Sequence, residues 1–240
     1  MTEKGVNHRK LTESGHTDAL LDFAVQALRT HHISPESLER RRKVIESLQT
    51  GAEIQQISPY PHNIKTQKGN FAEVILAEYI LSSSETQLPI YRLRYNTNIE
   101  QSMKGDDILL FDLDSDPVRI IVAESKFRKK PSKQVIAESI DGLVRSHKNG
   151  LAVSLMFVAE RLFDEGKREV GEKVQNCACI FFADKLQIDY IGFLLSDTKA
   201  GEFVDKHTTN ELHNLLMISL GMLSPEDIVK DAFSRLEQSL

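Results

Sequence analysis

Apolar residues recur every three or four positions along much of this chain, which is the spacing of one face of an α-helix. Several of these segments open on a capping residue, such as Ser34 before Pro35 and Ser224 before Pro225, and such signals are typical of helix starts. The pattern predicts helices at residues 17–32, 34–51, 68–81, 132–150, 151–164 and 167–175, one that begins at Thr209, and a last one at 224–240.

Other apolar runs are shorter, are bounded by turn residues and are rich in β-branched or aromatic side chains, which favours strands. Two of them predict a hairpin, in which Ile108–Phe111 is joined to Arg119–Ala123 by a turn around Asp116-Pro117. Further strands are predicted at 88–95, 178–183 and 190–195. From residue 68 onward, the order helix, strand, strand, strand, helix, strand predicts a mixed α/β core.

With 240 residues, the chain can bury the core of one large domain. We expect a polar, poorly ordered N-terminus at 1–16, a helical segment at 17–67, a core domain at 68–195, and C-terminal helices packed on the core at 196–240. The loop at 52–67 contains two prolines and marks the domain boundary.

Charge and hydropathy exclude some classes of protein. The formal net charge of -5 argues against a protein that coats nucleic acid through bulk charge, although it leaves room for a local basic groove. No apolar run approaches the ~20 residues that span a bilayer, and the polar start lacks the apolar region of a signal peptide. These features predict a cytoplasmic protein without a membrane partner.

Three isolated features favour ordinary structural roles. Cys177 and Cys179 alternate ahead of an apolar run, which favours small buried strand residues over a zinc site. The basic run Arg40–Lys43 is most simply a solvated helix face, and His147 is expected at the surface near a helix end. The chain lacks a glycine-rich phosphate loop, a zinc-binding histidine helix and a nucleophile elbow, so no small-molecule cofactor is predicted.

The second strand of the predicted hairpin continues into Glu124, Ser125 and Lys126. Alternate side chains of a strand share a face, so Glu124 and Lys126 are expected on the same side as the apolar residues that precede them. Asp107 directly precedes the first strand of the hairpin. Carboxylates and an amine therefore accompany strands that are otherwise apolar.

The helix at 68–81 carries a further acid on its apolar side. Glu73 shares a helical face with Leu76, Ala77 and Ile80. A core-facing carboxylate without a partner is costly, so it usually meets a cation, a metal ion or a hydrogen-bond donor.

Convergence of these four charged side chains predicts a metal site rather than a structural cluster of ion pairs. Glu73, Asp107 and Glu124 supply the oxygen ligands that Mg²⁺ prefers, and Mn²⁺ is expected to substitute for it. Lys126 can orient or activate an attacking water molecule, or stabilise the charge that develops on a phosphate.

The segments Gly69-Asn70-Phe71-Ala72-Glu73, Asp107 and Glu124-Ser125-Lys126 resemble, in order and approximate spacing, the motif of the PD-(D/E)xK nuclease superfamily. The resemblance covers residues 68–195. It implies a restriction-endonuclease-like core, with a central mixed sheet flanked by helices and extra helices at both termini. The helix that contains Glu73 and the strand that contains Glu124 are more narrowly similar to the nuclease subunit of the Hachiman anti-phage defence system, which implies a helicase partner.

This chain departs from the superfamily pattern at the acid that opens the hairpin. Gly105-Asp106-Asp107 replaces the usual Pro-Asp, so two adjacent aspartates compete for the metal-binding role. Asp107 is preferred because it directly precedes the apolar strand, whereas Asp106 would face the opposite side.

A dense basic segment follows the predicted site and contains Lys126, Arg128, Lys129, Lys130 and Lys133. Beside a centre that cleaves phosphodiesters, these side chains are expected to contact nucleic-acid phosphates without reading the base sequence. A solvated loop is the simpler alternative.

Two functional hypotheses follow from these observations. The first is a Mg²⁺-dependent nuclease that cleaves DNA, which the resemblance places in an anti-phage defence system as the effector that works with a helicase. The second is a non-catalytic module with a nuclease fold that docks a helicase or nucleic acid. The sequence leaves open DNA or RNA as substrate, end or internal cleavage, one or two metal ions, and the oligomeric state.

Overall fold

A single mixed sheet is the centre of the fold. The computed structural model describes residues 1–240 except 16, 49–52, 54 and 55. Within these residues, the strands are β1 (Asn7–Thr12), β2 (Ile108–Asp112), β3 (Arg119–Phe127), β4 (Gln187–Asp197) and β5 (Leu215–Met222). They lie in the order β1-β5-β4-β3-β2. β2 pairs antiparallel with β3, and all other neighbours are parallel.

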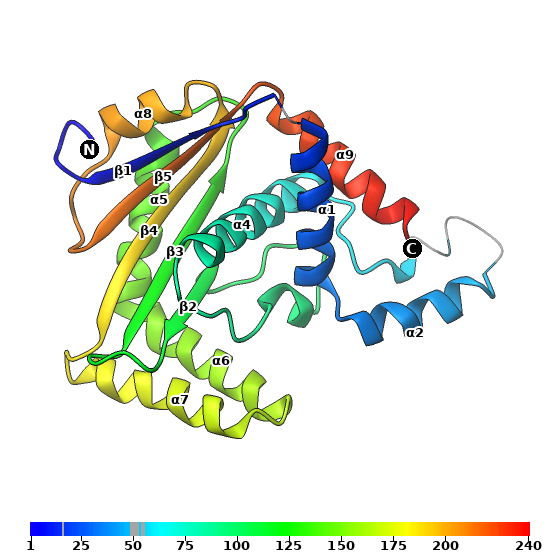
Figure 1. The fold of residues 1–240 in the computed structure, drawn as a ribbon, viewed down its shortest axis with the longest axis horizontal. Helices are drawn as coiled ribbons and strands as arrows, with labels where there is room; N and C mark the ends of the chain where they lie inside the picture. The colour runs from blue at the N-terminus through cyan, green and yellow to red at the C-terminus, as the bar shows by residue number, and fades with distance from the viewer. Residues whose placement is uncertain (16, 49–52, 54–55) are drawn as a thin grey trace.

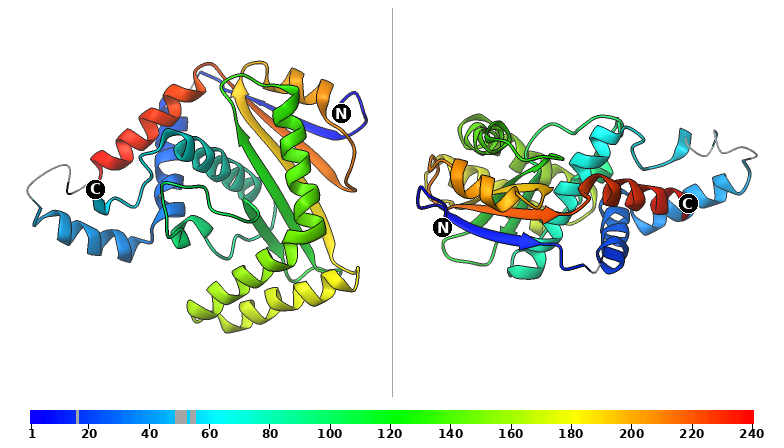
Figure 2. Two further views of the ribbon diagram at one scale, coloured as in Figure 1. Left: turned by 180° about the vertical axis from the view of Figure 1, so that it is seen from behind. Right: turned by 90° about the horizontal axis from the view of Figure 1, so that it is seen from above.

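Helices cover both faces of this sheet. They are α1 (Thr17–His32), α2 (Pro35–Ile45), α4 (Ile64–Ser83), α5 (Lys133–Arg145), α6 (Leu151–Asp164), α7 (Arg168–Phe182), α8 (Ala200–His207) and α9 (Pro225–Gln238). α4 lies in front of the sheet in Figure 1, with α1 and α9 packed against it. α5 crosses the opposite face, as the view from behind in Figure 2 shows. α6 and α7 form a helical hairpin beside the sheet.

The alternation of side chains along β3 divides the core into two clusters. Ile121 and Ala123 belong to the cluster that contains α4, whereas Ile120 and Val122 belong to the cluster that contains α5. Apolar residues on both faces explain why β3 reads as a continuous apolar run in the sequence.

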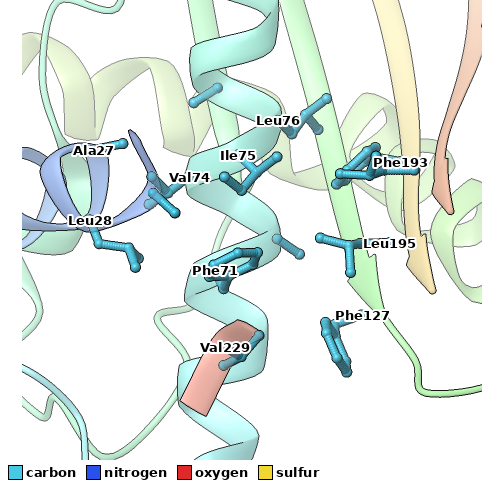
Figure 3. Close-up of a cluster of buried hydrophobic side chains, with 14 of the residues drawn as sticks. Ala27, Leu28, Phe71, Val74, Ile75, Leu76, Phe127, Phe193, Leu195 and Val229 are labelled. Atoms are coloured by element: carbon cyan, nitrogen blue, oxygen red, sulfur yellow. The ribbon is translucent and has the colours of Figure 1, made fainter. Parts of the chain in front are cut away.

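α4 is buried on nearly all sides. Figure 3 shows Phe71 and Leu76 of α4 among side chains of α1, such as Leu28, and of β4, such as Leu195. The helix is therefore hydrophobic around most of its circumference, which is typical of a central helix. Its rigid position fixes where Glu73 can reach.

The predicted class, an α/β protein with a central mixed sheet flanked by helices, is confirmed. The hairpin of β2 and β3 and the helices that begin at Thr17, Ser34-Pro35, Ser132 and Ser224-Pro225 also match the prediction. α4 extends the helix predicted at 68–81 at both ends. α2 ends at Ile45, and its predicted end near Gly51 lies outside the described residues. Over the described part of the chain, none of the helices combines the length and apolarity needed to cross a bilayer.

The predictions for two segments near the chain ends are wrong. The N-terminus was expected to be poorly ordered, yet Asn7–Thr12 forms β1. β1 is an edge strand whose residues are all exposed or only partly buried, so its sequence lacks apolar alternation. The helix expected from Thr209 is replaced by Leu215–Met222, which is β5. β5 is buried on both faces, and such a strand shows no alternation that would separate it from a helix.

The strand predicted at 178–183 is wrong because α7 continues to Phe182. Val174, Cys177 and Ala178 are buried at helical spacing, while Phe182 is largely exposed. Cys177 is buried and Cys179 is exposed, and both thiols are free. The expectation that these cysteines are buried strand residues therefore fails for both, since they lie on a helix.

The strand predicted at 88–95 is also wrong. This segment contains the 3₁₀ turn Arg92–Tyr95, and only Gln87 beside it forms a bridge, to Phe111 of β2. Ile90 and Leu93 are buried three residues apart, which a short turn achieves without strand pairing. α8 has no counterpart among the predicted elements.

We predict that Leu76→Ala in α4 lowers the free energy of unfolding by about 2–5 kcal/mol, because it leaves a cavity at a fully buried position. Chemical denaturation checks this value. Leu223→Ala is the matched control, since Leu223 is 77% exposed, and it is expected to change the free energy by less than about 0.5 kcal/mol. Equal effects of the two substitutions would contradict the central position of α4.

Candidate active site

Two of the predicted acids come together where β2 begins. Ile108, the first residue of β2, pairs with Ala123 of β3. Continuing this antiparallel register by one residue places Asp107 opposite Glu124, and such cross-strand neighbours have adjacent side chains. The edge of β3 beyond Ala123 has no β2 partner. This open edge lets side chains from both faces of the sheet approach Asp107.

At this edge, the side chain of Asp107 accepts a backbone hydrogen bond that a neighbouring strand would otherwise accept. Its Oδ2 accepts hydrogen bonds from the backbone N of Ser125 at 2.8 Å and from Ser125 Oγ at 3.0 Å. Ser125 is buried, so its N–H requires a partner. The middle residue of the Glu-Ser-Lys motif therefore fixes the carboxylate that precedes β2.

Glu124 and Lys126 lie on the face of β3 that α5 covers. Lys126 Nζ donates to Glu124 Oε1. Burial, the largest effect, raises the pKa of Glu124, the charge of Asp107 raises it further, and Lys126 opposes both, which leaves this pKa at about 7. Burial and like charge thus outweigh the single lysine.

Gly142 of α5 lies directly against Glu124. A Cβ built on Gly142 would lie 2.9 Å from Cδ of Glu124, which is closer than side chains normally approach. The absence of a side chain at this position lets α5 pack over the carboxylate. Gly142 was not singled out from the sequence, because a glycine within a helix carries no signal of the side chain it faces.

Glu73 reaches the same region from α4. Its side chain is buried, and Arg92 Nε lies 3.4 Å from Glu73 Oε1, an ion pair whose geometry falls short of a hydrogen bond. Burial raises the pKa of Glu73, the Arg92 charge lowers it, and the charges of Asp107 and Glu124 raise it, with a result of about 8. Glu73 is therefore near enough to Asp107 and Glu124 for their charges to raise its pKa.

Arg92 also holds the loop that carries the two aspartates. Its Nη2 donates to the carbonyl of Met103 at 2.8 Å, and its Nη1 donates to the carbonyl of Asp106. Asp106 Oδ2 is buried and has no hydrogen-bond partner within the described structure. Asp107 and Asp106 thus differ, because only Asp107 Oδ2 is fixed by donors from β3.

The donor chemistry of these acids suits a hard divalent cation. Glu73 and Glu124 have raised pKa values from burial and from nearby carboxylate charge, and a positive ion with oxygen ligands would relieve this cost. Among the residues that the structure describes, however, no three acidic, histidine or cysteine side chains are grouped closely enough to hold a metal ion. Ser125 and Lys126 donate hydrogen bonds to Asp107 and Glu124, and Arg92 forms an ion pair with Glu73, so a metal ion would have to compete with these partners.

A basic pocket of about 460 Å³ opens beside the acids. Glu73 and Asp107 line it. Its cationic lining residues are Lys65, Lys68, Lys126, Arg128 and Lys129. Lys65 and Lys68 of α4 were not predicted; their only sequence signal is their position one to two helical turns before Glu73.

Some of the predicted basic residues already form ion pairs with acids of this chain. Arg128 pairs with Glu138 at 2.8 Å, and Lys129 pairs with Glu226 at 2.8 Å. Lys130 and Lys133 are exposed and lie outside the lining of this pocket. The basic rim is therefore built from α4 and the start of the loop after β3.

A second pocket of about 230 Å³ lies behind the same two acids. Its walls are mainly apolar and include Met103 and Phe157. Because Glu73 and Asp107 line both pockets, they form the wall between a basic cavity and an apolar one.

The other features singled out from the sequence have structural partners. Arg41 donates to the carbonyl of Ile57, and Arg42 donates to the carbonyl of Ser239 at 3.0 Å. His147 is exposed, as expected, and its Nδ1 lies 2.5 Å from the hydroxyl of Tyr190.

Together, the fold and the site define a mixed α/β protein with carboxylates and a lysine at an open edge of its sheet. The family model named HamA matches residues 2–236 of this chain. The Hachiman protein HamA of Bacillus cereus is 34% identical over 237 residues, which cover 97% of this chain and 85% of that protein. The chain therefore belongs to the HamA family. The resemblance to a Hachiman defence protein is thus confirmed, while nuclease activity, a helicase partner and membership of the PD-(D/E)xK superfamily stay predictions.

We predict that Glu73 makes the stability of the protein depend on pH. Because burial raises its folded pKa from 4.5 to about 8, the folded state holds a proton that the unfolded state releases. The stability that this proton contributes is complete below about pH 4.5 and is lost as the pH rises through about 8. Thermal unfolding of Glu73→Gln should therefore show a larger gain in Tm over wild type at about pH 8.5 than at about pH 5.

Glu160→Gln, on the exposed side of α6, is the control and should follow the wild-type pH profile. A Glu73→Gln protein whose Tm differs from wild type by the same amount at both pH values would contradict the placement of Glu73.

Proposed function

We propose that this chain is a Mg²⁺-dependent nuclease that cleaves DNA in the cytoplasm, as the effector of the Hachiman anti-phage defence system. The observation that carries the proposal is the placement of Asp107 opposite Glu124, with Lys126 on Glu124 and Glu73 buried alongside. Family membership supports it, because the matched relative is a Hachiman protein. The sequence resemblance adds a PD-(D/E)xK nuclease motif and a helicase partner.

In this proposal, Asp107, Glu124 and Glu73 would hold the metal ion. When bound, it would supply Lewis acidity and lower the pKa of a water molecule. Lys126 would then be free of Glu124, so its ammonium group would face the substrate. Lys126 orients the water that attacks phosphorus in line with the departing oxygen, or stabilises the negative charge that develops on the phosphate.

The basic pocket supports a substrate with a phosphate backbone. Lys65, Lys68, Lys126, Arg128 and Lys129 gather around Glu73 and Asp107, although the formal net charge of the chain is -5. Local positive charge beside the acids favours binding to phosphates without reading the base sequence. The predicted contacts of Lys130 and Lys133 extend this rim along the loop.

A second candidate function is a non-catalytic module that docks a helicase or nucleic acid. The observation in its favour is that Arg92, Ser125 and Lys126 already contact Glu73, Asp107 and Glu124 through ion pairs or hydrogen bonds. A module of this kind would keep its partner affinity when the acids are replaced, whereas a nuclease would lose cleavage.

We predict that the purified chain cleaves DNA with Mg²⁺ or Mn²⁺ and that a chelator stops it. Glu124→Gln and Lys126→Gln should each lower the cleavage rate by about 100-fold or more, because each removes charge that acts on the reacting phosphate. Gel assays with plasmid and linear DNA measure the rate and separate internal from end cleavage. Circular dichroism checks that each variant is folded.

The chain contains a matched control. Glu165 and Lys167 form another Glu-x-Lys pair, with Lys167 Nζ 2.7 Å from Glu165 Oε2, and neither residue lines the basic pocket. Glu165→Gln and Lys167→Gln should cleave at the wild-type rate. Folded Glu124→Gln and Lys126→Gln proteins with full activity would rule out the nuclease site and favour the docking module.

A further inference from the structure

One acid from the C-terminal helix bridges two lysines that line the basic pocket. Glu226 lies in the first turn of α9. Its Oε1 lies 2.5 Å from Lys68 Nζ, and its Oε2 lies 2.8 Å from Lys129 Nζ. One carboxylate thus bridges two lysines that come from α4 and from the loop after β3.

Both lysines belong to the proposed site. Lys68 and Lys129 line the same cavity as Glu73, Asp107 and Lys126. Lys68 Nζ also lies 5.6 Å from the centre of the Phe127 ring at the end of β3, which limits the directions it can take. The two ammonium groups are therefore held beside a cavity that Glu73 and Asp107 also line.

Within the chain, the anion that binds this lysine pair is the Glu226 carboxylate. Hydrogen bonds from Lys129 and Lys68 lower the pKa of Glu226 to about 2, so it stays ionised across the neutral range. Yet the pair is partly open to solvent, since the Lys129 side chain is 68% exposed and that of Glu226 is 32% exposed. Exposed ion pairs contribute little net stability and are weakened by salt. A competing anion can therefore displace Glu226 without unfolding α9, which is anchored by buried apolar residues such as Val229.

We propose that Lys68 and Lys129 form a binding site for one backbone phosphate of the DNA substrate, and that Glu226 occupies this site until the phosphate displaces it. This inference rests on the proposed nuclease function and names a substrate contact for it. A phosphodiester has two non-bridging oxygens, so it can contact two ammonium groups at once, as the two carboxylate oxygens of Glu226 do. In the chain without DNA, the Glu226 carboxylate takes the place of the phosphate and so lowers the affinity of the protein for DNA.

The test is the equilibrium binding of a short fluorescent DNA duplex in a chelator, measured by anisotropy, so that cleavage plays no part. Glu226→Gln should tighten the Kd by about 3-fold or more at low salt, because the lysine pair is no longer occupied. Lys68→Gln should weaken the Kd by a similar factor and lower the slope of log K against log salt by about 1. In the double variant, loss of Lys68 should cancel most of the gain from Glu226→Gln.

Asp227→Asn is the matched control. Asp227 is the next residue in the same turn of α9, is exposed, and forms no ion pair with any residue in the described ranges. Its substitution removes the same charge, so it should change the Kd by less than about 2-fold. An equal gain for Asp227→Asn would show a bulk charge effect and overturn the proposal, as would an unchanged or weaker Kd for Glu226→Gln. If Lys68→Gln fails to fold, Lys129→Gln replaces it, with the same expected loss.

The inference and the nuclease assignment fail in different ways. If the wild-type chain cleaves DNA while Glu226→Gln leaves the Kd unchanged, the phosphate site is wrong and the nuclease assignment stands. If the wild-type chain never cleaves DNA but Glu226→Gln binds it more tightly, the phosphate site stands on a non-catalytic module.

Discussion

The hydrogen bonds from Ser125 hold the Asp107 carboxylate at the open edge of β3, and the proposed site depends on them. β2 begins at Ile108, so the N–H of Ser125 lacks a strand partner, and the Asp107 carboxylate supplies the acceptor. This contact holds the residue before β2 beside Glu124. β2 does not extend along β3 beyond Ala123, so this edge of the sheet stays accessible.

The electrostatic state of the site follows from burial. Glu73 and Glu124 are placed where water is scarce and where other carboxylates are near, so each has a raised pKa despite a basic partner. Arg92 and Lys126 compensate part of this cost in the resting chain. A divalent cation would compensate it more fully, which is the physical reason for the proposed metal dependence. Glu226 compensates the charge of Lys68 and Lys129 in the same way, since its carboxylate is their anionic partner when no substrate is bound.

The sequence predicted the parts of the site that depend on local periodicity. Glu73 was found because its helical face is apolar, and Glu124 with Lys126 because strand alternation places them together. The hairpin was predictable from two apolar runs and a turn. Strands β1 and β5 were missed for opposite reasons, since one is an exposed edge and the other is buried on both faces.

Long-range partners were beyond the reach of the sequence. Arg92 acts through backbone carbonyls of the following loop, and no sequence pattern marks an acceptor of that kind. Lys68 and Glu226 are 158 residues apart, so only the packing of α9 against α4 brings them together. The choice between Asp106 and Asp107 as metal ligand depended on register. The pairing of Ile108 with Ala123 supports Asp107, but its metal-binding role stays a prediction.

We propose that the open edge of β3 holds a metal ion. Anomalous scattering from a wild-type crystal soaked in Mn²⁺ would locate such an ion. We expect a peak between the carboxylates of Asp107 and Glu124, with Lys126 moved off Glu124. A crystal without such a peak at a Mn²⁺ concentration that supports cleavage, or a peak held by Asp106 without Asp107, would contradict it.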